Sequence, residues 1–146
     1  MLGSHPFGTQ ITWSELESRF SACKLWEDRY RQLILLARQL PSLSEQERGS
    51  QLELYGCENR VWLGMQVQPD GRLHFYADSE GRIVKGLLAV ILTRIEGLSA
   101  DDVLALDIPA ALASLGIADQ LSSSRAQGIE AISARLHELA RTAHGA

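Results

Sequence analysis

Cysteine is scarce in this sequence: Cys23 and Cys57 are the only two among 146 residues, and they form no C-x-x-C pair. Small secreted domains that depend on disulfides are rich in cysteine, so this composition argues against a disulfide framework. Structural zinc sites take four cysteine or histidine ligands, and iron–sulfur clusters commonly take several cysteines. The four histidines are scattered and form no HxxxH or HExxH motif. We therefore expect no metal site and no resident cofactor.

Motifs that bind phosphate groups are also absent, because the chain has neither a G-x-x-x-x-G-K-[ST] loop nor a G-x-G-x-x-G turn. The formal net charge is -4 and no run of five basic residues occurs, which argues against nonspecific binding of nucleic acid. The longest apolar run, residues 87–92, is too short to span a bilayer, and residues 1–10 lack the features of a signal peptide. These absences predict a cytoplasmic protein that binds neither nucleic acid nor membrane directly.

The patterns that are present predict a mixture of helices and strands. Apolar spacing and capping signals predict helices over residues 13–23, 26–40 and 81–96, two short helices opened by Ser99 and Asp107, and a last helix from residues 122–124 to Ala143. Ser79 is expected to cap the helix over residues 81–96. That helix is apolar nearly all round, which is typical of a buried helix.

Between these helices the hydrophobic period changes to two. Residues 61–67 and 73–77 alternate around the turn sequence Pro69-Asp70-Gly71, which predicts a β-hairpin, and residues 50–55 are the candidate third strand. We expect an α+β fold in which a small antiparallel sheet is packed by several helices. A single domain is expected over residues 1–146, with residues 1–11 as a flexible arm.

The most distinctive residue is Cys57, which follows Gly56 in a polar turn just before the hairpin. Glycine allows backbone angles that would hold this thiol at the tip of a bend. Tyr55, Val61 and Trp62 are expected to wall a pocket for it. Arg60 would favour the thiolate and Glu58 would oppose it, so the direction of the pKa shift stays open. Cys23, at a helix end, is interpreted as a small buried hydrophobe.

Three segments make the sequence familiar. The loop Gly56-Cys57-Glu58-Asn59-Arg60-Val61-Trp62 resembles the cysteine loop of the SufE family of sulfur acceptors. Residues 78–87 (DSEGRIVKGL) and 121–128 (LSSSRAQG) are similar to two further segments of that family. The run Glu58-Asn59-Arg60 and the arm over residues 5–9 (HPFGT) look closer to the CsdE branch. Ala126 departs from the pattern, because the family usually has serine there.

The resemblance implies that Cys57 accepts persulfide sulfur from a pyridoxal-phosphate-dependent cysteine desulfurase of the CsdA or SufS type. It implies a carrier that stimulates the desulfurase and relays the sulfur, rather than an enzyme, with roles in iron–sulfur assembly and, through a CsdL-type protein, tRNA modification. Sulfur transfer of this kind is thiol exchange and needs one nucleophile. The same resemblance implies a fold shared with IscU-type scaffolds. It places the contacts with the partner at Glu58, Asn59, Arg60, Asp78, Arg82 and Arg125.

Two other functions remain open from the residues. The first is an iron–sulfur scaffold, although the chain offers one plausible ligand where several are common. The second is a cysteine hydrolase in which His74 acts as the base for Cys57, which requires the two side chains to lie about 3 Å apart.

Overall fold

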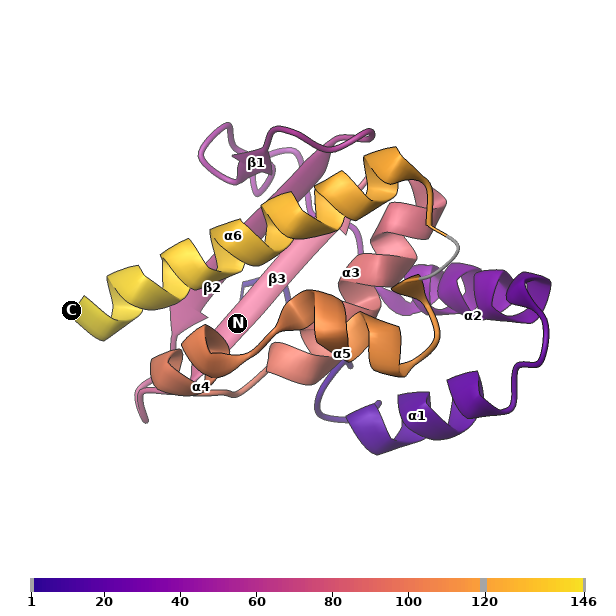
Figure 1. Ribbon diagram of the computed structural model, residues 1–146. Coiled ribbons are helices and arrows are strands. Elements are labelled where there is room, and N and C mark those ends of the chain that lie inside the picture. The colour runs from indigo at the N-terminus through magenta and orange to yellow at the C-terminus, as the bar shows by residue number, and fades with distance from the viewer. Residues whose placement is uncertain (1, 119–120, 146) are drawn as a thin grey trace.

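The computed structural model describes residues 2–118 and 121–145. In chain order its elements are α1 (Trp13–Ser21), α2 (Trp26–Gln39), β1 (Glu53–Leu54), β2 (Val61–Val67), β3 (Leu73–Ser79), α3 (Arg82–Ile95), α4 (Ala100–Ala105), α5 (Ile108–Ser114) and α6 (Ser123–Gly145). The expected α+β fold is confirmed, and the predicted helices and hairpin are present (Figure 1).

The sheet has three antiparallel strands in the order β1-β2-β3. The hairpin register places Leu63 opposite Ala77 and Met65 opposite Phe75, as the alternation in the sequence predicts. Residues 50–55 do supply the third strand, but β1 has only two residues. Because β1 lies at an edge and ends at Leu54, the cysteine loop begins at the border of the sheet.

One face of the sheet packs against helices. Val61, Leu63 and Phe75 are buried there, and α6 crosses this face diagonally in Figure 1. Helix α3 contacts β3 on one side and α2 on the other, so it is buried as predicted. Gly86 permits the approach of α2, because a Cβ at this position would lie 2.3 Å from the Leu33 carbonyl oxygen. Each fully buried leucine of this core contributes about 1.5–3 kcal/mol.

The opposite face of the sheet is covered by residues 41–52. Trp62 and Tyr76 form a second buried cluster there with Leu43. The guanidinium carbons of Arg48 and Arg60 lie 4.5 and 4.9 Å from the centroid of the Trp62 ring. Such cation–π contacts favour a planar cation over the indole face. Trp62 is therefore a core residue of this second cluster.

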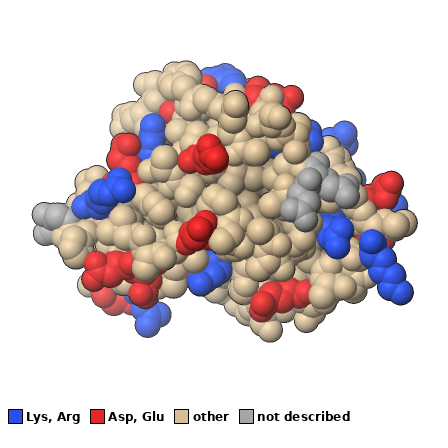
Figure 2. Space-filling view, viewed as in Figure 1, with Lys and Arg blue, Asp and Glu red and all other residues tan. Residues whose placement is uncertain are grey.

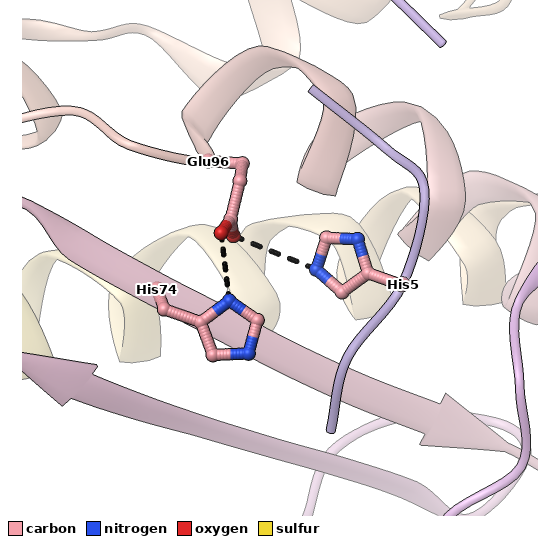
Figure 3. A group of neighbouring side chains, drawn as sticks. All are labelled: His5, His74 and Glu96. Atoms are coloured by element: carbon pink, nitrogen blue, oxygen red, sulfur yellow. Dashed lines mark hydrogen bonds and ion pairs between the residues drawn. The ribbon is translucent and has the colours of Figure 1, made fainter. Parts of the chain in front are cut away.

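The N-terminal arm is packed against the hairpin, which corrects the expectation of a flexible arm for the described residues 2–11; residue 1 of that expected arm lies outside them. Phe7 is fully buried. Figure 3 shows His5 and His74 facing Glu96, with His74 Nδ1 2.7 Å from Glu96 Oε2. His5 Nε2 donates to the Phe75 carbonyl, also at 2.7 Å. These buried polar contacts hold the arm in place, and the sequence gives no local sign of them.

The expected cap of α3 is also corrected. Gly81 is the N-cap of α3 and has no side chain to cap it. Ser79 ends β3 instead, where its hydroxyl donates to the Arg60 carbonyl and accepts from the Gly81 N–H. Ser79 thus ties the end of the cysteine loop to the start of α3.

Charged side chains do not separate by sign on the face shown in Figure 2, where basic and acidic residues are interspersed and two acidic groups lie near the centre. Among the helices of the described residues, none combines the length and the apolar character that crossing a membrane requires.

Candidate functional site around Cys57

The loop between β1 and β2 presents Cys57 as the sequence predicts. Gly56 has φ +101°, a left-handed backbone conformation that favours glycine. The chain therefore reverses just before Cys57 and directs this side chain back toward the helices. The thiol donates a weak hydrogen bond to the Gly128 carbonyl oxygen in α6, with Sγ and O 3.7 Å apart.

The thiol borders a small hollow between the loop, α3 and α6, with a volume of about 10 Å³. Its apolar walls are Val84 and Leu87 from α3 and Ile129 and Ile132 from α6. A hollow of this size is about the smallest that can hold one water molecule. The hollow therefore has room for about one more atom beside the sulfur.

These walls differ from the expected ones. Tyr55 is 73% exposed, and Trp62 belongs to the cluster on the other face of the sheet. Val61 is buried in the main core. The apolar walls come from residues 27 or more positions away in the sequence, so no local pattern at the loop could identify them. The sequence pointed to these walls only through the family resemblance, because residues 78–87 include Val84 and Leu87 and residues 121–128 end next to Ile129.

Burial raises the pKa of the Cys57 thiol above the ordinary value. This resolves the direction that the sequence left open. Arg60 does not act on the thiol, because its guanidinium donates to both carboxylate oxygens of Glu53 at 2.9 and 3.0 Å. In this conformation the sulfur is a protonated, sheltered thiol, which is a poor nucleophile until it is deprotonated.

The two remaining loop residues of the predicted partner surface, Glu58 and Asn59, differ in their surroundings. Glu58 is exposed and lines the hollow beside Cys57. Asn59 packs its side chain over Gly81, where a Cβ would lie 2.2 Å from the Asn59 Oδ1. Arg82, one residue later, is exposed at the start of α3. Glu58, Arg60 and Arg82 can therefore meet a partner, and Asn59 holds the loop against α3.

The predicted partner contact at Asp78 does not fit its surroundings, because the residue is buried. Its side chain has no exposed surface and pairs with Arg48 at 2.7 Å and with Lys85 at 3.2 Å. It also accepts a hydrogen bond from the Leu43 N–H. Burial alone would raise the pKa of Asp78, but these partners outweigh it and lower the pKa. Asp78 therefore stabilises the fold, fastening residues 41–52 to β3.

Arg125 lies in the first turns of α6 and lines the Cys57 hollow. Its guanidinium carbon is 5.8 Å from the centroid of the Tyr30 ring in α2. It also lines a wider groove of about 480 Å³ whose other walls include Trp26, Tyr30 and Ile34. Its buried Nε has no hydrogen-bond partner among the described residues. Arg125 thus connects the thiol to an open, partly aromatic surface.

His74 does not serve Cys57 as a base. Its Nδ1 contacts Glu96, and its Nε2 lies 2.7 Å from the Leu2 carbonyl oxygen. The group of His5, His74 and Glu96 contains side chains that can bind metal ions, but the ring nitrogens are occupied, since His5 Nδ1 accepts from the Phe7 N–H. Burial would raise the pKa of Glu96, yet hydrogen bonds from His5, His74 and Phe75 outweigh it and lower the pKa. The group therefore fastens the arm.

Comparison with known proteins gives three findings. Residues 14–140 match the family model SufE, described as an Fe-S metabolism associated domain. The chain is 50% identical over 129 residues to the sulfur acceptor protein CsdE of Escherichia coli (strain K12), a match that covers 88% of each chain. The fold resembles the solution structure of a hypothetical protein from Thermus thermophilus, with a TM-score of 0.73, 23% identity and full coverage of both chains. The last likeness concerns the fold alone.

Proposed function

The chain belongs to the SufE family, and from this premise we propose that Cys57 accepts sulfur from a pyridoxal-phosphate-dependent cysteine desulfurase and becomes a persulfide. The observation that carries the proposal is the position of Cys57. It stands on a glycine turn beside an atom-sized apolar hollow, in a chain that is 50% identical to a protein named as a sulfur acceptor.

The reaction is an exchange between two sulfur centres. The Cys57 thiolate attacks the outer sulfur of the persulfide carried by the desulfurase, and a new S–S bond forms on Sγ. The S–S bond of the donor breaks, and the donor cysteine leaves as a thiolate that can take the proton lost by Cys57. No electrons are gained or lost overall. Cys57 is partly buried against α6, and burial raises its pKa, so we propose that the loop opens before this attack.

The hollow suits the product. A persulfide adds one sulfur atom to Cys57, and the space beside Sγ is about 10 Å³, close to the volume needed by one water-sized atom. The apolar side chains from α3 and α6 would limit the access of dissolved thiols, which reduce a persulfide. A carrier with this shelter can hold sulfur between the desulfurase and a later acceptor.

We further propose that removal of the sulfur stimulates the desulfurase, because the donor cysteine is freed for another turnover. The partner is a desulfurase of the CsdA or SufS type, and a CsdL-type tRNA-modifying protein is one candidate recipient. We propose the cytoplasm as the location of the reaction, because its reducing conditions suit two free cysteines. These assignments rest on the family and on the likeness to CsdE.

The decisive test is mass spectrometry of the intact protein after incubation with a desulfurase and cysteine. We expect an adduct of about 32 Da that is removed by thiols. Cys57→Ser should gain no adduct, whereas Cys23→Ser should gain it at the rate of the wild type. An adduct that persists in Cys57→Ser would overturn the assignment of the acceptor.

A further inference from the structure

Gly128 is a buried glycine inside α6, and neither the backbone nor the helix packing explains it. Its φ is not among the positive values found at other glycines, so an L-residue can adopt this conformation. Glycine inside a helix costs about 0.5–1 kcal/mol relative to alanine. The contact at Gly86 shows the contrast, because there the Leu33 backbone leaves no space for a side chain.

The neighbour of Gly128 is the thiol. A Cβ at residue 128 would lie 3.5 Å from Cys57 Sγ and 3.8 Å from Cys57 Cβ. These are ordinary van der Waals distances, so the unmodified thiol would tolerate alanine. The free thiol of Cys57 therefore does not require glycine at position 128.

A persulfide changes this requirement. Its outer sulfur lies about 2.05 Å from Sγ and needs space of its own. The hollow that Gly128 and Cys57 both line has a volume of about 10 Å³, enough for about one water-sized atom. A methyl group on residue 128 would take up the space beside Sγ, and the hollow could not hold the methyl group and a second sulfur together.

We propose that Gly128 is the residue that reserves space for the outer sulfur of the Cys57 persulfide. This inference rests on the proposed function, since it needs Cys57 to carry sulfur. With glycine at position 128, the loop can return to its sheltered position after loading. With alanine, the loaded loop stays outside and its persulfide meets solvent.

The test compares Gly128→Ala with wild type and with Gln127→Ala, an exposed neighbour on the same helix. Each protein is loaded by a desulfurase with cysteine, separated, and exposed to a dilute small thiol, and the loss of the adduct of about 32 Da is followed by intact mass. We expect Gly128→Ala to lose its sulfur about tenfold faster, a tenfold shift in the population of the sheltered loop. Gln127→Ala should match wild type.

Two readouts separate this role from a structural one. The unloaded Gly128→Ala protein should melt at or above the wild-type temperature, and its Cys57 should react with iodoacetamide at the wild-type rate. Adding Val84→Ala, which widens the hollow from α3, should restore the lifetime of the persulfide.

The outcomes are distinct. If wild type gains no adduct, the proposed function fails. If wild type loads and Gly128→Ala loses sulfur at the same rate, the role of Gly128 is wrong and the acceptor function stands. A lower melting temperature or faster alkylation of unloaded Gly128→Ala would equally overturn it, because the methyl group would then disturb the free thiol.

Discussion

Cys57 meets two opposed requirements at the scale of one side chain. As a free thiol it is sheltered, and burial raises its pKa. As a nucleophile it must be a thiolate, which forms more readily in water or next to a cation. Among the described residues, burial is the cause found for the shift of the Cys57 pKa, and Arg60 pairs with Glu53 instead. We therefore propose that activation of Cys57 requires the thiol to leave the hollow, which would couple its reactivity to its position.

The raised pKa of Cys57 has a consequence for stability. The native state holds the thiol proton more tightly than the unfolded state. The protonated thiol therefore contributes fully to the free energy of unfolding below the ordinary thiol pKa of about 8.5, and this contribution is lost as the pH rises above that value. The free energy of unfolding should therefore fall more steeply between about pH 7 and pH 9.5 in wild type than in Cys57→Ser. Urea denaturation under reducing conditions measures this. Parallel pH dependences in the two proteins would contradict it.

At Asp78 the expected effect is on folding. Asp78→Asn leaves Arg48 and Lys85 with a neutral partner and should lower the free energy of unfolding by about 3 kcal/mol, as is common when one partner of a buried ion pair is removed. Glu80→Gln, at an exposed neighbour, is the matched control and should change stability little. Urea denaturation provides the comparison. If Asp78→Asn left the urea midpoint unchanged and weakened desulfurase stimulation, Asp78 would instead contact the partner.

At the scale of elements, the cysteine loop is held firmly at its two ends and more weakly in the middle. Arg60 pairs with Glu53, Asn59 packs on Gly81, and the thiol has one weak hydrogen bond to Gly128. Segments with few buried contacts open at low cost in free energy. The loop is therefore suited to move while β1 and β2 stay paired.

This arrangement predicts two rates of alkylation. Iodoacetamide should modify Cys57 slowly in the free protein and faster when a catalytically inactive desulfurase binds the open loop and leaves the thiol accessible. The denatured protein gives the upper limit, and buried Cys23 is the internal control whose rate should not change. Alkylation in the free protein as fast as in the denatured one would rule out the sheltered state.

The elements themselves could be predicted because their signals are local. Apolar spacing gave α2 and α3, and alternation with a Pro-Asp-Gly turn gave the hairpin. Thr12 caps α1 as expected, since its hydroxyl accepts from the Glu15 N–H. The packed arm could not be predicted in this way. His5 finds its partners about 70 residues later, at Phe75, and no periodicity reports a contact over that distance.

The site was predictable to the same extent. Gly56 and Cys57 are adjacent in sequence, so the position of Cys57 on a glycine turn was predicted correctly, and its role as the nucleophile stays a prediction. The apolar walls of the hollow belong to α3 and α6, and the apolar spacing of these helices predicts burial in the core without indicating a hollow. Asp78 was misread because a buried carboxylate with two cationic partners looks, in sequence, like any surface acid.

At the scale of the molecule, Arg125 links the Cys57 hollow to the groove between α2 and α6. Arg125→Glu should weaken desulfurase stimulation about tenfold, equivalent to about 1.4 kcal/mol, with an unchanged thermal melt. Arg141→Glu, at an exposed position farther along α6, makes the same charge change away from the thiol and should retain stimulation. A titration of the desulfurase rate with each variant is the measurement. Equal stimulation by both variants would exclude Arg125 from the partner surface.

The anchored ends of the cysteine loop also fix its reach. Leu54 and Val61 are paired across β1 and β2, and Cys57 lies three residues beyond Leu54. A fully extended chain spans at most about 3.6 Å per residue, so the tip can travel only about 10 Å from the edge of the sheet. Under the proposed function, a donor must bring its sulfur within that radius, either at its surface or in a recess no deeper than the loop is long. The length of residues 55–60 would then decide which donors can deliver sulfur to Cys57.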